Sequence, residues 1–260
     1  MEPALSALRV QVRVVRALLL REILTRYGRH NIGFLWLFVE PMIFTLGVAA
    51  LWTFARFHEH SSIPVVAFAV TGYSSVLLWR NMPTRCIGAV EPNLALMSHR
   101  QVKVIDIFLS RLVLEAMGAT ISFIVLSLVF IAMGWMKMPH DVLKIAQAWF
   151  MLAWFGMALA IFLGSLSIRS ELVEKLWYPA AYLLFPLSGA AFMVDWLPPA
   201  ARKVVLLLPM VHGVECLREG YFGPAVSSHH DLAYMGIFSL ALTAVALAQE
   251  RVASKQVVPG

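Results

Sequence analysis

Six apolar segments, most of them long enough to cross a lipid bilayer, constrain this chain more than any other feature. They lie at residues 33–56, 63–80, 106–134, 145–168, 176–194 and 231–249. About 20 apolar residues are needed to span about 30 Å of hydrocarbon. With 60% hydrophobic and only 14% charged residues, the chain has too little polar surface for a soluble fold. We therefore expect an all-α integral membrane protein with six transmembrane helices.

The basic residues are distributed unequally between the connecting segments. Fourteen Lys and Arg residues fall in 1–32, 80–103, 169–175 and 250–260, whereas the alternate connections hold six. Positive residues concentrate on the cytoplasmic side of membrane proteins, so both termini are expected in the cytoplasm. The net charge of +6 is explained by this topology, and no nucleic-acid partner is expected. The whole chain, 1–260, is interpreted as one transmembrane domain, with a cytoplasmic interface helix at 1–32, a six-span bundle at 33–249 and a cytoplasmic tail at 250–260.

The first 32 residues have the pattern of an amphipathic helix. Apolar residues recur at spacings of three and four, and the arginines form a separate stripe; the apolar positions are Leu5, Leu8, Val12, Val15 and Leu19. An arginine-rich amphipathic helix is typical of a membrane interface. A soluble helix packed on a partner is the alternative.

Two further segments are neither spans nor disordered loops. Residues 85–100 place Ile87, Val90, Leu94 and Met97 on one side of a short helix that starts anew near Glu91 and Pro92, which indicates a docking surface. Residues 195–230 contain short apolar runs broken by proline and glycine. They predict a re-entrant or interfacial helical hairpin on the outer side, before the last span.

Common catalytic and metal-binding motifs are missing from the sequence. There is no G-x-x-x-x-G-K-[ST] phosphate loop, H-E-x-x-H, C-x-x-C or G-x-S-x-G motif. If ATP drives this protein, another chain must bind it. Paired loop histidines, such as His58 with His60 and His229 with His230, seldom complete a metal site without further ligands. We interpret them as solvated residues, with Glu59 and Asp231 as the neighbouring groups that a metal site would need. Cys86 and Cys216 show neither metal nor disulfide spacing.

A few polar residues lie inside the apolar segments. Glu40, beside Pro41, is costly in a bilayer unless it faces water or a partner; a functional role and a structural hydrogen bond at a kinked helix remain equal alternatives. Arg111 and Glu115 are spaced to pair along one helix face, which favours a structural ion pair.

Three blocks of the chain resemble the permease subunits of ABC-2 class exporters, in particular the capsular polysaccharide export family. They are REILTRYGRHNIGFLWLFVEP at 21–41, EPNLALMSHRQVKVIDIFLSRLVLE at 91–115 and LPMVHGVECLREGYFGP at 208–224. The first block is the most specific, because its matching residues occur in the family's order: Arg26, Tyr27, Gly33, Leu35, Trp36 and Pro41.

The resemblance implies the transmembrane subunit of an ATP-driven exporter that moves lipid-linked capsular polysaccharide across the bacterial inner membrane. It would work as a homodimer on two cytoplasmic ABC ATPase subunits, which bind ATP and Mg²⁺, and would itself hold no cofactor and catalyse no reaction. Coupling to the ATPase is assigned to Arg26, Arg29, Arg85, Glu91, Pro92 and Met97. An outer gate that meets a periplasmic polysaccharide co-polymerase, and through it an outer-membrane export protein, is assigned to Trp196, Pro209, Glu215, Arg218 and Phe222.

A translocated glycan would pass aromatic faces on which sugar rings stack. Tyr73, Trp154 and Tyr182, with Glu40, are the pathway residues that we expect, although Trp and Tyr in membranes more commonly form interfacial belts. Export of O-antigen, teichoic acid or a small molecule is the main alternative function. A membrane-embedded transferase using Glu40, His212 and Glu215 would require these groups to converge in one pocket.

Overall fold

The computed structural model describes residues 2–27, 31–54, 63–97 and 102–257, and all regular structure in these ranges is helical. Two helices precede the first connection, α1 (Glu2–Tyr27) and α2 (Asn31–Phe54). The remaining long helices are α3 (Val65–Cys86), α5 (Val104–Ala132), α6 (Val142–Ser167), α7 (Leu172–Leu187) and α10 (Leu232–Val257). Short helices fill the connections: η1 (Glu91–Asn93), α4 (Leu94–Met97), η2 (Val194–Trp196), α8 (Pro199–Val205), α9 (Pro209–Phe222) and η3 (Gly223–Ala225).

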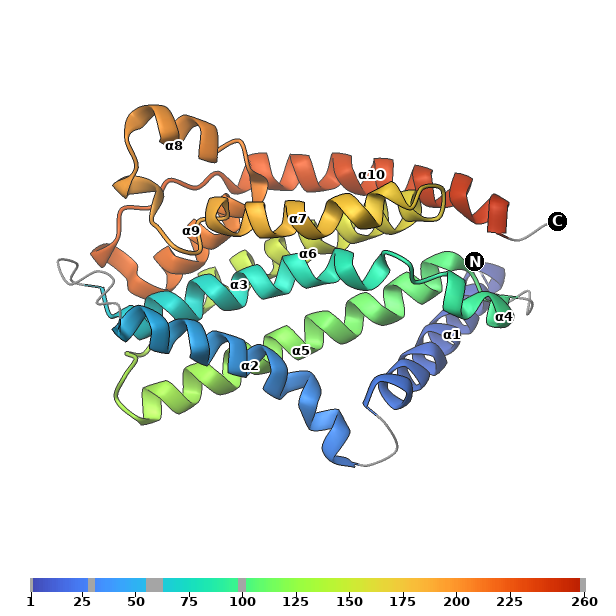
Figure 1. Cartoon of the computed structure of the whole chain (residues 1–260), viewed down its shortest axis with the longest axis horizontal. Coiled ribbons are helices and arrows are strands. Elements are labelled where there is room, and N and C mark those ends of the chain that lie inside the picture. The colour runs from blue at the N-terminus through green and yellow to red at the C-terminus, as the bar shows by residue number, and fades with distance from the viewer. Residues whose placement is uncertain (1, 28–30, 55–62, 98–101, 258–260) are drawn as a thin grey trace.

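Six helices run back and forth along the long axis of the molecule, and each corresponds to one predicted apolar segment. Helices α2, α3, α5, α6, α7 and α10 alternate in direction, so that α1 and the C-terminal end of α10 lie at the same end (Figure 1). We call this the termini end, and the end that carries α8 the hairpin end. Three of these helices, α5, α6 and α10, are long and apolar enough to cross a membrane.

For three of the six predicted segments, the helix ends lie within three residues of the predicted boundaries. Helix α3 continues six residues beyond the predicted end at 80, and α10 continues eight residues beyond 249. The fifth segment differs at both ends. That segment, expected at 176–194, is the helix α7, which spans 172–187. It ends early because Ser188 is followed by Gly189 with φ of +82°, a left-handed conformation that glycine adopts without steric cost. The apolar residues after this turn belong to a buried loop instead of a span.

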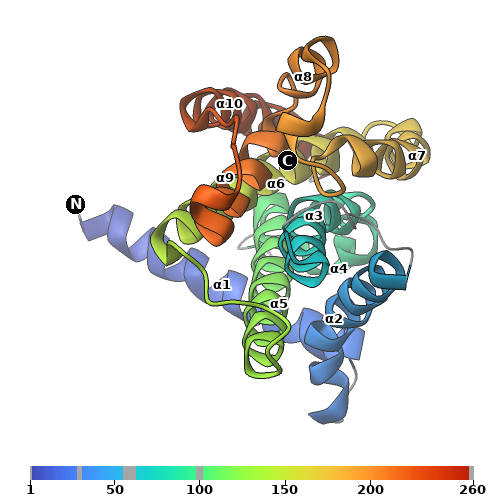
Figure 2. The ribbon, with the colours of Figure 1, turned by 90° about the vertical axis from the view of Figure 1, so that its left-hand side faces the viewer.

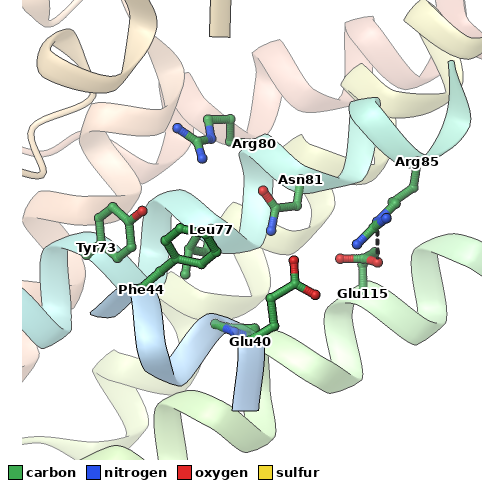
Figure 3. A pocket seen from close by; sticks show the side chains of 9 residues that line it. Glu40, Phe44, Tyr73, Leu77, Arg80, Asn81, Arg85 and Glu115 are labelled. Carbon is green, nitrogen blue, oxygen red and sulfur yellow. Dashed lines mark ion pairs between the residues drawn. The ribbon is translucent and has the colours of Figure 1, made fainter. Parts of the chain in front are cut away.

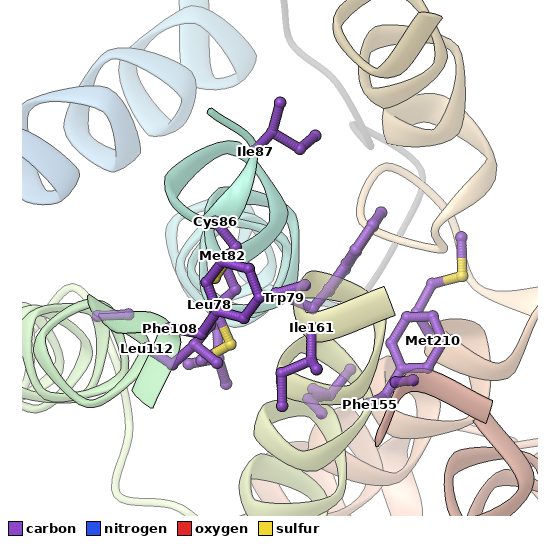
Figure 4. Close-up of a cluster of buried hydrophobic side chains, with 14 of the residues drawn as sticks. Leu78, Trp79, Met82, Cys86, Ile87, Phe108, Leu112, Phe155, Ile161 and Met210 are labelled. Carbon is purple, nitrogen blue, oxygen red and sulfur yellow. The ribbon is translucent and has the colours of Figure 1, made fainter. Parts of the chain in front are cut away.

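Helices α3 and α6 form the centre of the bundle. Figure 4 shows side chains of α3, among them Leu78, Trp79 and Met82, packed between Phe108 of α5 and Phe155 of α6. Close approach depends on glycine: a Cβ at Gly156 would lie 2.8 Å from the Trp79 Cα. Small residues at such crossings allow backbones in a membrane to approach.

Helix α1 packs across α5 at the termini end, on a face that the sequence pattern did not predict. Val14 and Leu18 join the core, and the Gln11 amide donates to the Asp106 carboxylate. Val12 of the predicted apolar stripe is 60% exposed instead. Leu20 and Leu24 are exposed as well, on the same side of the helix as the exposed Arg9, Arg13 and Arg16. The helix thus turns one apolar face toward the protein and a mixed apolar and basic face outward.

Candidate functional site

A cavity of about 220 Å³ opens between α2, α3 and α5. Glu40, Pro41 and Phe44 of α2 line it on one side (Figure 3). The other walls are formed by α3 and α5, through Tyr73, Leu77, Arg80, Asn81, Arg85 and Glu115. Seen along the bundle, α3 lies between α2 and α7 (Figure 2), and Tyr182 of α7 approaches the same place, with its ring 5.8 Å from the Arg80 guanidinium carbon. Two of the four predicted pathway residues, Glu40 and Tyr73, therefore line one cavity, and a third, Tyr182, contacts the Arg80 that lines it.

The charged groups of this cavity are not equally compensated. Arg85 forms an ion pair with Glu115 at 2.7 Å between α3 and α5. Arg80 lies over the Tyr182 ring and interacts with the Tyr73 hydroxyl. The Glu40 carboxylate points toward the Asn81 side of the cavity in Figure 3 and forms no ion pair with a described residue.

The fourth predicted pathway residue lies elsewhere. Trp154 of α6 faces α10, where its indole N–H donates to the Thr243 hydroxyl at 3.1 Å. Its ring is 6.5 Å from that of Phe150 on the same helix. This position joins two helices of the bundle and contributes nothing to the cavity.

At the termini end, the two segments predicted to contact an ATPase lie side by side. The Arg21 guanidinium of α1 donates to the Asn93 side chain of η1 at 2.5 Å, and Asn93 donates to the Ala89 carbonyl at 2.8 Å. A second link joins α1 to α5, since Arg111 pairs with Glu22 at 3.2 Å and also donates to the Arg85 carbonyl. Each of the two charged residues of α5 thus pairs with another helix: Arg111 with Glu22 of α1, and Glu115 with Arg85 of α3.

The short segment after α3 begins again at Glu91, as predicted, with Pro92 in its first turn. Glu91 and Pro92 are exposed, whereas Met97 is buried. Glu91 also borders an open groove between this segment, the α6–α7 connection and the end of α10. The side chain of Arg26 and all of Arg29 lie outside the described residues.

At the hairpin end, α9 is a buried helix whose Arg218 is completely enclosed. Its guanidinium donates to the carbonyls of Gly189, Ala190 and Phe192 and lies 3.6 Å from the centre of the Phe68 ring. The indole of Trp196 stacks on the same Phe68 ring, with the two ring centres 5.3 Å apart. Arg218 therefore fastens α9 to the turn after α7 and to α3.

Glu215 of the same helix binds backbone N–H groups, whereas Arg218 binds backbone carbonyls. Its carboxylate accepts the N–H of Val194 and the N–H of His229, both at 3.1 Å. Burial raises the pKa of Glu215, and these two hydrogen bonds and the charge of Arg218 oppose the rise. Pro209 begins α9 and Phe222 ends it. All five residues assigned to an outer gate thus lie in one packed unit formed by 188–231.

The histidines of this end have protein partners. His229 contacts the Asp195 carboxylate at 2.9 Å, and His230 contacts Glu219 at 3.0 Å. His212 uses both ring nitrogens on backbone groups, Leu206 and Asp231. No cluster able to hold a metal occurs among the described residues, and His58 and His60 lie outside them.

Comparison with known proteins places this arrangement in a family. The family model for ABC-2 type transporters matches residues 13–222. The chain belongs to the ABC-2 type transporter family. Capsule polysaccharide export inner-membrane protein CtrC of Neisseria meningitidis serogroup B is 43% identical over 98% of this chain and 96% of its own length. Capsule polysaccharide export inner-membrane protein BexB of Haemophilus influenzae is 40% identical over 98% of this chain and 96% of its own length. Polysialic acid transport protein KpsM of Escherichia coli is 26% identical over 95% of this chain and 96% of its own length.

Two features of this ABC-2 transporter chain were not found by sequence reasoning. Arg80 and Asn81 line the cavity, although the sequence marked only the end of an apolar segment there; an arginine at the edge of a span was the available signal. The Arg21–Asn93 contact had no sequence signal, because it joins residues far apart in the chain. Glu40, in the cavity, shares no pocket with His212 and Glu215, whose polar atoms are engaged by backbone groups, so a shared acid and base site is not formed.

Proposed function

We propose that this chain is the transmembrane subunit of an ATP-driven ABC exporter that moves lipid-linked capsular polysaccharide across the bacterial inner membrane. The observation that carries the proposal is similarity over nearly the whole length, at 43% and 40% identity, to proteins named for capsule polysaccharide export at the inner membrane. Export of O-antigen, teichoic acid or a small molecule has no comparable support among these relatives.

In this proposal α2, α3, α5, α6, α7 and α10 are the six spans, and the termini end faces the cytoplasm. The distribution of Lys and Arg supports this orientation. Helix α1 lies at the membrane surface, with Val12, Leu20 and Leu24 toward lipid. Arg9, Arg13 and Arg16 of this helix are exposed, as interfacial attraction to anionic lipid requires.

Two copies of a partner ATPase dock at the termini end. The docking surface consists of the start of η1, with Glu91 and Pro92, the adjoining end of α1, with Arg26, and the nearby Arg85. Arg29, which follows α1 in the sequence and lies outside the described residues, is assigned to the same surface. Support comes from the Arg21–Asn93 hydrogen bond, which makes α1 and η1 one mechanical unit. Met97 is buried and acts by holding the segment in place. ATP and Mg²⁺ belong to the ATPase, and this chain contributes no catalytic residue.

The pathway runs along the face formed by α2, α3 and α7, which meets its equivalent in a second copy. Charged and polar side chains facing lipid are costly, so the cavity with Glu40, Arg80 and Asn81 is best placed toward a shared pore. Exposed aromatic rings of Phe44, Tyr178 and Tyr182 border the same face. Trp154 is not part of this pathway in our proposal, because it faces α10.

The packed unit 188–231 serves as the outer gate. Its exposed surface, including Trp196, is the place for a periplasmic co-polymerase that passes the polymer to an outer-membrane export protein. Glu215 and Arg218 act inside the unit and hold its backbone turns.

The test is purification of this chain with the ABC ATPase encoded beside it. We expect a stable complex of two copies of each subunit whose ATP hydrolysis in lipid differs from that of the ATPase alone. Cells that lack this chain should retain lipid-linked capsular polymer on the cytoplasmic side of the inner membrane, and the intact gene should restore surface capsule. A chain that purifies alone and leaves hydrolysis unaltered would contradict the proposal.

A further inference from the structure

The cavity between α2, α3 and α5 contains two opposite charges that do not neutralise each other. Arg85 in the same cavity shows the contrast, because it is paired with Glu115 at 2.7 Å. Arg80 forms no ion pair with any carboxylate of the described residues, and its contacts are the Tyr182 ring and the Tyr73 hydroxyl. The Glu40 carboxylate likewise lacks a cationic partner within the described ranges.

The position of Arg80 makes this arrangement significant. Arg80 lies six residues before the end of α3 at Cys86, which is about 9 Å at 1.5 Å per residue. It is partly covered by protein, near the termini end of the bundle. A partly covered charge without a counter-charge is costly unless water or a ligand compensates it. Packing alone would be satisfied by an apolar side chain at this place.

The chemistry of the walls defines what would compensate both charges. A guanidinium presents a planar set of donors that matches a carboxylate or phosphate with two parallel hydrogen bonds. A ring stacked against its face, as Tyr182 is, leaves the donors at its edge available. Glu40 accepts hydrogen bonds, and Asn81 both donates and accepts them. The cavity therefore presents one anion-binding group beside groups that suit hydroxyls.

We propose that this cavity binds a sugar unit carrying an acidic group, with the anion on Arg80 and the sugar hydroxyls on Glu40 and Asn81. The inference rests on the proposed function as a glycan exporter and names the class of glycan unit that the entrance of its pathway selects. Glu40 also repels a second nearby anion. The site thus favours an acidic sugar over a dense polyanion such as inorganic polyphosphate.

The experiment uses the complex of this chain with its ATPase in phosphatidylcholine nanodiscs, which contain no anionic lipid. Binding is measured calorimetrically with three probes: a tetramer of N-acetylneuraminic acid, the same tetramer with its carboxyl groups reduced to alcohols, and a phosphodiester-linked sugar oligomer of similar length. We expect the reduced tetramer to bind about 10- to 100-fold more weakly, because a charge-assisted hydrogen-bond pair contributes about 1.5–3 kcal/mol and 1.4 kcal/mol is tenfold. The two anionic probes distinguish carboxylate from phosphate recognition.

Variants assign the effect to the cavity. Arg80→Gln should lose the preference for the acidic tetramer, and Arg80→Lys should retain part of it, since a lysine keeps the charge and loses the fork geometry. Glu40→Gln should bind inorganic polyphosphate more tightly than the unaltered chain does. Arg202→Gln, at the hairpin end, is the matched control and should bind as the unaltered chain does. Thermal unfolding of each complex checks that the variants are folded.

Equal binding of the acidic and reduced tetramers, or an unchanged preference in Arg80→Gln, would overturn the inference. Displacement of the tetramer by phosphatidylglycerol added to the nanodiscs would also overturn it, because the site would then be a lipid site. These failures are separate from failure of the proposed function, in which the complex would not form or ATP hydrolysis would not respond to this chain.

Discussion

Single residues of the hairpin end show how tightly a buried charge can determine local packing. The Arg218 guanidinium is enclosed by three carbonyls and the Phe68 ring. Burial lowers its pKa to about 9, and Glu215 opposes that change. The carbonyls come from a turn that depends on Gly189, whose φ is +82°. One arginine therefore joins three separate stretches of chain.

Gly72 of α3 is the residue that leaves room for this arginine. A Cβ at Gly72 would lie 2.4 Å from the Ala190 carbonyl oxygen and 2.5 Å from an Arg218 nitrogen. We expect Gly72→Ala to destabilise the protein by about 1–3 kcal/mol, the usual cost of overpacking, measured by thermal unfolding in detergent. Gly47→Ala in α2 is the control, because nothing lies within 4 Å of its Cβ position. Equal stability of the two variants would show that the Arg218 contacts adjust freely.

The importance of Arg218 could be predicted from the sequence, but its partners could not. Resemblance in the block 208–224 marked Glu215 and Arg218, and the structure places both in one packed unit. Their partners are backbone groups of residues 189–194 and 229, and backbone groups leave no signal in side-chain patterns. Arg80 was missed for a related reason, since only folding brings it beside Tyr182.

At the scale of elements, hydrophobic periodicity was sufficient for the long helices and insufficient where turns interrupt apolar sequence. The six apolar segments all became helices, because their lengths and compositions leave few other options. Helix α7 ended seven residues before the predicted limit, since the loop after Gly189 is buried by α9 and needs apolar residues for that reason. The predicted stripe on α1 was displaced because Val14 and Leu18, not Val12, meet α5.

The proposed contact between η1 and a partner ATPase can be tested by a charge reversal. Glu91 is exposed at the start of η1, so Glu91→Lys should leave the fold intact. Loss of one exposed ion pair is worth about 0.2–1 kcal/mol, which predicts up to about a fivefold weaker effect of this chain on ATP hydrolysis. Lys203→Glu in α8, at the opposite end, should have no effect. Unaltered hydrolysis with Glu91→Lys would remove this residue from the docking surface.

The packed unit 188–231 is expected to loosen at mildly acidic pH through His230. Burial lowers the pKa of His230, and the Glu219 charge opposes this, while Lys144 and His212 add to the lowering. The unfolded chain then binds more protons than the folded one, so stability falls as the pH drops below about 6.5. Glu219 changes stability in the same direction: burial raises its pKa, but Lys144 and His230 outweigh burial and the net pKa is lowered. That contribution is lost at lower pH, below about 4.5.

Hydrogen exchange of residues 223–231 at about pH 7.5 and about pH 5.5 measures this effect. Faster exchange at the lower pH is expected in the unaltered chain, and a smaller pH difference in His230→Gln. Glu215, whose pKa is raised, acts in the opposite direction and is present in both chains, so the comparison cancels its contribution. An identical pH response in the two chains would show that His230 does not control this unit.

At the scale of the whole molecule, the bundle has one face that suits lipid and another that does not. The outer surface of α10 is apolar, with Ile237 and Leu240 exposed. The face of α2, α3 and α7 carries the cavity with its uncompensated charges. Because charges facing hydrocarbon are costly, a second copy is expected to cover the second face, with the pathway between the two copies.

Cross-linking in native membranes tests this arrangement. Single cysteines at Phe44 of α2 or Tyr182 of α7, which are 55% and 73% exposed, should join two copies when a short bismaleimide is added. Leu240→Cys on α10, 61% exposed, faces lipid in this arrangement and should remain monomeric on a denaturing gel. Cys86 and Cys216 are buried, so the unaltered chain provides a low background. Cross-linking at Leu240 instead of at Phe44 and Tyr182 would place the shared interface on α10. Arg80 and Glu40 would then face lipid, at a high cost in free energy. The same experiment therefore tests both the position of the dimer interface and the function proposed for the charged cavity.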